Sequence, residues 1–547
     1  MESFQNAGLM IGVQAVSRLG SFALNQAVAG HVSPAAYGYA NITLQLVLTT
    51  ILFLPREPFR RAIVRLASTP STPTSTPAPH PHGLAPWVAL PAALIACLAY
   101  ALTSRAGDGA SLSQAHGALL ATLVGAALEL AAEPLYVVLL TRAAYGVRAR
   151  VEGLGVALRC GVIAACVLGM GWGPLAFGVG HVAYGAWLFL AYAAQIGWDA
   201  AVWVPRTNVL VAYKDTLAPL VLQTGLKYVL THGESLILVA ASSFYDQGLF
   251  ALVNNLGSLV VRIVFQPLEE IAFNTFSQSR STPTDAPTDG EADDGGEGDN
   301  EVEGGGYTLL CVLTKSVLLV GAAFAAFGPP FSRLLLDVLH GSLWVSTGAP
   351  GVLAWYTLYV GFLALNGITE AYVHAMASPD QLHTLNGMLL VFTLGFAVAG
   401  LAGTSVAGTI GLIVANMFNM TQRICYSLHC IYVSFPTAGS APLPPGASWR
   451  DLLPAPAVLA SFAFASLLSS GVGATFVALT DQGRYPSHAV RALHAISALP
   501  GLAAVFVSLY VFERPLLVSV VGVLRSRRHS SRRHSSSSAS TSSKKEE

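Results

Sequence analysis

Apolar residues run in long stretches along this chain, and the polar residues inside them recur at helical spacing. Gln247 to Gln266 is a run of twenty residues with a single charge, Arg262. A helix of that length measures about 30 Å, the hydrocarbon thickness of a bilayer. Its polar residues recur every four positions, at Asn254, Ser258, Arg262 and Gln266. The run therefore predicts a membrane-spanning helix with one polar stripe.

About fourteen segments are apolar and long enough to span a membrane. They are residues 8–30, 34–54, 84–104, 116–141, 151–170, 172–197, 217–241, 247–266, 307–330, 352–377, 384–402, 404–432, 453–479 and 495–513. With 53% hydrophobic and only 11% charged residues, the composition lies far from that of soluble proteins. The pattern predicts an all-α polytopic membrane protein of about fourteen transmembrane helices.

Polar segments divide the chain. Residues 68–83 are a Ser/Thr/Pro linker, and residues 279–306 hold nine acidic residues among Gly, Pro and Thr, so we expect both to be disordered. The predicted domains are a six-helix lobe over 1–200, a second over 201–435, two further helices over 436–515 and a basic, Ser-rich tail over 516–547. We expect a monomer.

Lys and Arg are distributed unevenly among the loops. With a cytosolic N-terminus, eighteen of the 29 lie in cytosolic loops and the tail, and four lie in the opposite loops. The positive-inside rule therefore predicts that both termini are cytosolic. The chain ends Lys544-Lys545-Glu546-Glu547, the dilysine pattern that a retrieval coat reads as an endoplasmic-reticulum address.

The two sets of six segments share a polar template. The first and seventh segments align Gln14, Arg18 and Asn25 with Gln223, Lys227 and Glu234, and the second and eighth align Asn41, Gln45 and Thr49 with Asn254, Ser258 and Arg262. The ends of the second and eighth segments align Arg56 and Glu57 with Glu269 and Glu270. The fourth and tenth segments align Glu129 and Glu133 with Asn366 and Glu370. Because six is even, both copies would have the same orientation. Parallel repeats of this kind build transporters with a substrate site between the lobes.

Charged residues within the spans have two interpretations. Arg18, Lys227, Arg262 and Arg423 could hold an anionic head group, because cationic side chains match phosphate oxygens. Glu133, Glu234 and Glu370 would then line or gate the cavity. Alternatively, the charges pair with one another and lock the lobes, as Arg18 could with Glu234.

Enzymatic chemistry finds little support in the sequence. There is no metal-ligand spacing, no phosphate-cradling glycine loop and no nucleophile elbow. We expect no cofactor, no metal and no nucleic-acid partner, and we interpret the chain as a transporter that is not an enzyme.

Four motifs resemble one known family. DQGLFALVNNLGSLVVRIVFQPLEE, LFLPREPFRRA, ALNGITEAY and VANMFNMTQRI are similar to the Rft family of endoplasmic-reticulum membrane proteins. That family belongs to the multidrug, oligosaccharidyl-lipid and polysaccharide flippase superfamily, which implies two six-helix lobes and two extra helices. The motif positions are Arg56, Glu57, Arg60 and Arg61 at the cytosolic mouth, then Asn254, Asn255, Arg262, Glu269 and Glu270, then Asn419 and Arg423.

The resemblance implies a function in N-glycosylation. The protein would move a dolichol-diphosphate oligosaccharide from the cytosolic to the luminal leaflet, with Arg18, Lys227, Arg262 and Arg423 neutralising the diphosphate while the tail stays among membrane lipids. A non-transporting accessory role in the same pathway is the alternative. An ion-coupled small-molecule exporter is a third hypothesis, which the arginines disfavour because such exporters rely on carboxylates.

Overall fold

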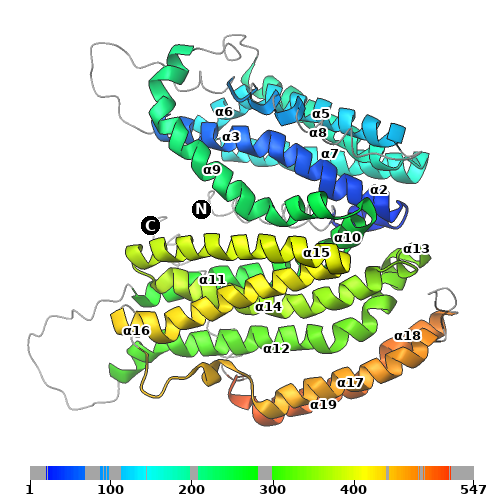
Figure 1. Ribbon diagram of the computed structural model, residues 1–547, viewed down its shortest axis with the longest axis vertical. Helices are drawn as coiled ribbons and strands as arrows, with labels where there is room; N and C mark the ends of the chain where they lie inside the picture. Colours follow the sequence, from blue (N-terminus) through cyan, green and yellow to red (C-terminus); the bar gives the residue numbers. More distant parts are fainter. Residues whose placement is uncertain are drawn as a thin grey trace, which may run out of the picture. The chain divides into compact units, whose positions relative to one another are not determined.

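In the computed structural model, every regular element of the described residues is a helix (Figure 1). The described residues are 20, 22–67, 87–89, 91–93, 95–97, 112–142, 144–197, 207–280, 299–438, 443–478, 480, 485, 487–516 and 518. The linker 68–83, residues 281–298 of the acidic stretch, Arg18, Lys544 and Lys545 lie outside them. The helix that follows the acidic stretch begins at Asp299, within the segment expected to be disordered.

The chain divides into two compact units, and the first combines residues 1–252, 338–349 and 397–412. Its elements are α2 (Pro34–Gly38), η1 (Tyr39–Leu44), α3 (Gln45–Ala67), α5 (Leu112–Ala131), α6 (Glu133–Thr141), α7 (Tyr145–Ala164), η3 (Ala165–Gly169), α8 (Pro174–Ile196), α9 (Thr207–Ala241), α13 (Ser342–Val345) and the first half of α10 (Phe244–Val260). The short segments η1 and η3 are π-helical turns within longer helices.

Unit 2 combines residues 253–337, 350–396 and 413–547. Its elements are the second half of α10, η5 (Val261–Phe265), α11 (Gln266–Arg280), α12 (Asp299–His340), α14 (Ala349–Met376), α15 (Pro379–His429), η6 (Cys430–Ser434), α16 (Phe435–Ala438), η7 (Trp449–Leu452), α17 (Pro456–Ala478), α18 (His488–Ile496) and α19 (Leu499–Phe512). The last residues of α12, the first residue of α14 and the middle of α15 fall at unit boundaries. The domain limits expected from the sequence stay a prediction.

Ten helices of the described residues are long and apolar enough to cross a membrane. One of them, Pro379–Thr437, contains two helices, because Ala407 and Gly408 have non-helical backbone angles and Gly408 has a φ of +55°. The prediction of an all-helical polytopic membrane protein is confirmed. The number fourteen stays a prediction, since the expected spans 8–30 and 84–104 are described only in part.

Glycine allows α5 and α8 of unit 1 to pack closely. A Cβ atom on Gly125 would lie 2.7 Å from the backbone of His181, and one on Gly178 would lie 2.6 Å from the Ala118 carbonyl oxygen. Small residues permit such close contact between membrane helices, where lipid supplies no hydrophobic force between them. These glycines therefore set the distance between the two helices.

Glycine also allows close packing of helices in unit 2. A Cβ on Gly321 of α12 would lie 2.8 Å from Cα of Gly361 on α14, and Gly501 of α19 faces Ala465 of α17. The last pair continues into a buried cluster that joins α12, α17 and α19 through Ala326, Val458, Phe462, Ala465 and Val505. The two final helices are thus packed onto the rest of their unit through α12.

We predict that Gly125→Ala destabilises the protein, because the new methyl group collides with backbone that cannot move without separating α5 from α8. The expected cost is about 1–3 kcal/mol. Thermal unfolding of the purified protein in detergent would measure it. Gly161→Ala on α7 is the matched control, since its Cβ would meet nothing within 4 Å. Equal melting temperatures for the two variants would contradict the packing argument.

Candidate functional site

Unit 1 contains a buried cluster of two arginines and two glutamates. Arg56 and Arg60 project from α3, while Glu129 lies near the end of α5 and Glu133 begins α6. Arg56 Nη1 lies 3.1 Å from Glu129 Oε2, and Arg56 Nε lies 3.0 Å from Glu133 Oε2. Arg60 forms a fork on Glu133 with distances of 2.5 and 2.6 Å. The side chain of Glu133 is only 2% exposed, so its charge depends on these two arginines.

Matched spacing explains why the four groups meet. The arginines are four residues apart on one helix, and the glutamates are four residues apart on the α5–α6 segment. Both pairs therefore project from one face, a single turn apart, and can pair in register. The sequence shows this spacing but not that the two segments are neighbours. The motif residues Arg56 and Arg60 are predicted to lie at a cytosolic mouth, and Glu129 is not among the predicted site residues.

A second, more open group lies between α3 and α9 of the same unit. Glu57 Oε1 accepts from Arg61 at 2.7 Å and lies 3.6 Å from Lys227 Nζ. The Lys227 ammonium also lies 5.7 Å from the centre of the Phe53 ring, and its side chain is 49% exposed. Lys227 is thus only weakly neutralised. Glu234, two turns further along α9, is half-buried.

In unit 2, Arg262 lies on the π-helical turn η5, where the Gln266 N–H donates to the carbonyl of Val261, five residues earlier. The guanidinium donates to the carbonyl oxygen of Ser258 at 3.0 Å and to its hydroxyl at 2.7 Å. Arg262 is exposed and forms no ion pair with a carboxylate of the described residues. Single π-helical turns within helices frequently occur at functional sites.

The polar residues before Arg262 are held more firmly. Asn254 Oδ1 accepts a hydrogen bond from the Tyr356 hydroxyl of α14 at 2.9 Å, and the ring of Tyr356 packs on Gly257. Asn255, its neighbour, is half-buried. Asn254 therefore attaches α10 to α14, which steadies the helix that presents Arg262.

A cavity of about 640 Å³ in unit 2 gathers three carboxylates and one arginine. It is lined by Val261, Gln266, Glu269, Glu270, Phe273, Leu363, Asn366, Gly367, Glu370, Ala371, His374, Met420 and Arg423. Arg423 donates to both oxygens of Glu370 at 2.6 Å, and Glu370 also accepts from Asn366 at 2.8 Å. Glu269 packs against Gly367, whereas Glu270 is exposed. Asn419, one turn before Arg423, is half-buried.

These clusters occupy positions that the predicted repeat aligns. Glu133 of unit 1 corresponds to Glu370 of unit 2, and each accepts two hydrogen bonds from an arginine. Arg60 donates through Nε and Nη2, whereas Arg423 donates to both oxygens of Glu370 through Nη2 alone. The source of the arginine differs: α3 supplies it in unit 1, whereas α15 supplies Arg423 in unit 2. At the position aligned with Arg56, unit 2 has Glu269. Unit 2 therefore has an extra carboxylate where unit 1 has an extra cation.

The predicted site residues thus separate into two groups. Arg56, Arg60 and Arg423 are engaged by carboxylates of their own unit, whereas Lys227 and Arg262 are the more available cations. Arg18 lies outside the described residues. Among the described residues, no group of three or more His, Cys, Asp or Glu side chains could hold a metal ion.

Comparison with known proteins covers almost the whole chain. The family described as Rft protein matches residues 2–522. The Man(5)GlcNAc(2)-PP-dolichol translocation protein RFT1 of Xenopus tropicalis is 30% identical over 500 residues, which cover 86% of this chain and 88% of that one. The protein of the same name from Mus musculus is 29% identical over 466 residues, covering 80% and 83%.

A solved structure has a similar fold. The lipid II flippase MurJ, in an inward closed conformation, matches with a TM-score of 0.60 over 93% of this chain and 99% of its own, at 14% identity. Such low identity shows the fold alone. Since the family pattern spans residues 2–522 and the relatives align over most of both chains, this multi-pass membrane protein belongs to the Rft protein family.

Proposed function

We propose that the protein moves a Man5GlcNAc2-diphosphate-dolichol lipid from the cytosolic to the luminal leaflet of the endoplasmic reticulum, for N-glycosylation. The observation that carries the proposal is family membership over residues 2–522, with relatives named as translocation proteins for this lipid. A fold shared with a lipid II flippase supports a transporter for a large lipid-linked sugar. The protein would act without a cofactor.

The diphosphate would be held by Arg18, Lys227, Arg262 and Arg423. Lys227 and Arg262 are best suited to receive it, because each is exposed. Among the described residues, Lys227 has only a 3.6 Å contact with Glu57 and Arg262 forms no ion pair with a carboxylate. Arg423 would have to exchange Glu370 for a phosphate oxygen. Arginine at mid-membrane is costly unless it faces protein or water, which also favours a functional site at Arg262.

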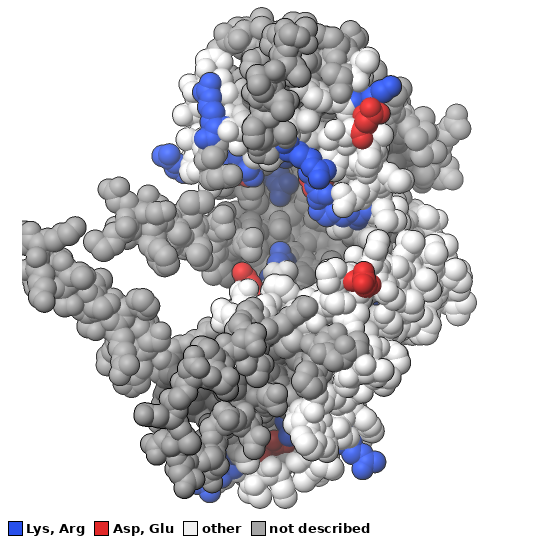
Figure 2. Space-filling model, turned by 90° about the vertical axis from the view of Figure 1, so that its left-hand side faces the viewer, with Lys and Arg blue, Asp and Glu red and all other residues white. Residues whose placement is uncertain are grey.

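We also propose the number of transmembrane helices and the side of the membrane on which the termini lie. Fourteen transmembrane helices would form two six-helix lobes and two further helices, with both termini in the cytosol. Figure 2 shows Lys and Arg side chains (blue) on one face of the molecule, prominent over the upper part. The dilysine at Lys544 and Lys545 would return the protein to the endoplasmic reticulum through a retrieval coat.

An accessory role in the same pathway has one observation in its favour. Of the cations within the described spans, Arg56, Arg60 and Arg423 are committed to carboxylates, and the glutamates that hold Arg56 and Arg60 are buried. Groups fixed in this way contribute to the architecture more than to a site that must bind and release a substrate. A non-transporting protein would need only such a scaffold and a docking surface.

We predict that Arg262→Glu abolishes translocation of the dolichol-diphosphate oligosaccharide in vesicles that contain only the purified protein. Losing one charge-assisted contact alone lowers the affinity for the diphosphate about tenfold, and the reversed charge repels the diphosphate. Arg150→Glu is the control, because Arg150 is also exposed and bonds only to the Gly146 carbonyl. Folding of both variants would be checked by thermal unfolding.

Two results would separate the hypotheses. Transport by the wild type and by the folded Arg262→Glu variant alike would refute a diphosphate site at Arg262. No transport by the correctly oriented wild type would instead favour the accessory role.

We predict that Glu133→Gln lowers the free energy of unfolding by about 3–5 kcal/mol, because it leaves Arg60 without its counter-charge and Arg56 with Glu129 alone. Glu152→Gln is the matched control. Its ion pair with Arg148 joins residues four apart on α7 and is partly exposed, so the expected loss is at most about 1 kcal/mol. A Glu133→Gln variant as stable as Glu152→Gln would contradict a structural role for the cluster.

A further inference from the structure

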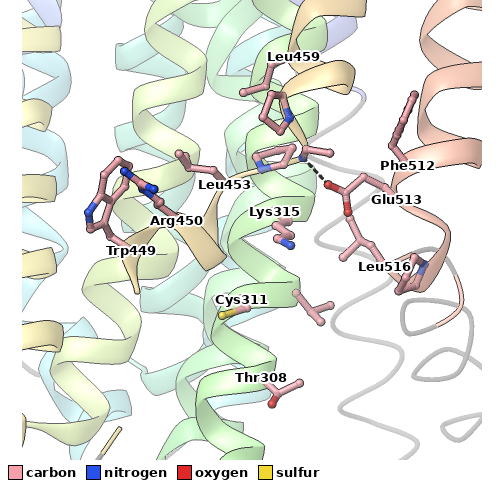
Figure 3. Close-up of a pocket in the computed structure, with 15 residues that line it drawn as sticks. Thr308, Cys311, Lys315, Trp449, Arg450, Leu453, Leu459, Phe512, Glu513 and Leu516 are labelled. Carbon is pink, nitrogen blue, oxygen red and sulfur yellow. Dashed lines mark hydrogen bonds between the residues drawn. The ribbon is translucent and has the colours of Figure 1, made fainter. Parts of the chain in front are cut away.

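A cavity of about 700 Å³ in unit 2 lies apart from the charged clusters described above (Figure 3). It is lined by Thr308, Cys311, Val312, Lys315, Trp449, Arg450, Leu453, Pro454, Ala455, Pro456, Leu459, Phe512, Glu513, Pro515 and Leu516. These residues come from the first part of α12, from η7 and the chain after it, from the start of α17 and from the end of α19. The cavity therefore lies where several spans begin or end, at the level of the lipid head groups.

Lys315 is the central feature of this cavity. It lies nine residues after Gly306, where the candidate span of α12 begins, which corresponds to about 13 Å of helix. No ion pair joins Lys315 to a carboxylate of the described residues, and its side chain is half-buried. An ammonium group at this depth among apolar walls is stable only if it reaches water or meets an anion.

The one carboxylate of the cavity already has a role. Glu513 is 5% exposed, and its Oε1 accepts the backbone N–H of Ala455 at 2.6 Å, immediately before α17 begins (Figure 3). A carboxylate at this position satisfies a free donor at the helix N-terminus and interacts favourably with the helix dipole. Among the residues that line the cavity, the two cations Lys315 and Arg450 therefore outnumber the one carboxylate.

The mouth of the cavity is rigidly built. The short 3-10 helix η7 presents Trp449 and Arg450, and it is attached to α12 and η6 by hydrogen bonds. Tyr307 Oη lies 3.1 Å from Asp451 Oδ2, and the Tyr432 hydroxyl donates to the Ser448 carbonyl at 3.2 Å. Trp449 is 54% exposed, as expected for tryptophan at a membrane–water interface.

The apolar lining continues onto exposed surface. Leu453, Leu459 and Phe512 each line the cavity and are at least 39% exposed, so they face lipid in a membrane. A ligand bound here could keep acyl chains in the bilayer while its head group reached Lys315 and Arg450. A soluble phosphate compound would gain nothing from this lining.

We propose that this cavity binds the head group of an anionic phospholipid of the surrounding bilayer. Lys315 contacts the phosphate, Arg450 closes over the head group from the mouth, and the acyl chains lie along Leu459 and Phe512. The site is separate from the proposed diphosphate site and does not depend on the proposed transport. It serves to hold α17 and α19 against α12.

The test uses the purified full-length protein, delipidated in detergent. Thermal unfolding would be measured with increasing dioleoyl phosphatidylserine, with dioleoyl phosphatidylcholine and with inorganic phosphate. We expect stabilisation by phosphatidylserine alone. Lys315→Met should weaken its apparent affinity about tenfold, as for loss of a charge-assisted contact, and Lys315→Arg should retain it.

Lys214→Met on α9 is the matched control, because it removes an exposed lysine of unit 1. Equal weakening in Lys214→Met and Lys315→Met would refute the site in favour of general attraction of a basic surface for anionic lipid. Equal stabilisation by inorganic phosphate would refute a lipid ligand. A Lys315→Met variant that loses stability to the same extent in both lipids would show that Lys315 acts only within the protein.

Discussion

A charged side chain in a bilayer is costly unless it meets an opposite charge, a protein dipole or water, and both units are built around this constraint. In unit 1 the α3 arginines and the glutamates of α5 and α6 neutralise one another at 2.5–3.1 Å. In unit 2 Arg423 and Glu370 do the same at 2.6 Å. Each pair joins helices that are far apart in the sequence, so the charges that would be most costly alone fix the arrangement of the helices.

Pairing also separates structural cations from available ones. An arginine held by two hydrogen bonds to a buried carboxylate cannot bind a substrate without giving up that contact. Lys227 and Arg262 have no such commitment within the described part of the chain, where Lys227 lies 3.6 Å from a Glu57 oxygen and Arg262 donates to Ser258. The case for a diphosphate site is therefore strongest at Lys227 and Arg262, the cations that carboxylates neutralise least.

Helix packing complements the charges. Gly125 and Gly178 bring α5 and α8 together, and Gly321 does the same for α12 and α14. Close packing between backbones leaves little free volume, whereas the two cavities described in unit 2 are lined in part by charged side chains. One of these cavities contains Arg423 and Glu370, and the other contains Lys315. The latter is lined by residues of α12, η7, α17 and α19 and of the chain beside them.

The helical class and the membrane location followed from local pattern, because an apolar run of about twenty residues must form its own hydrogen bonds in lipid. The polar stripe that contains Arg262 was likewise predictable, because its residues recur every four positions. The pairing of Arg60 with Glu133 was not, although both residues were identified, since it depends on which helices become neighbours across 73 positions. Nor could spacing show that Lys315 forms no ion pair with a carboxylate of the described residues. Whether a charge is neutralised depends on distances between helices, and these arise only when the chain packs.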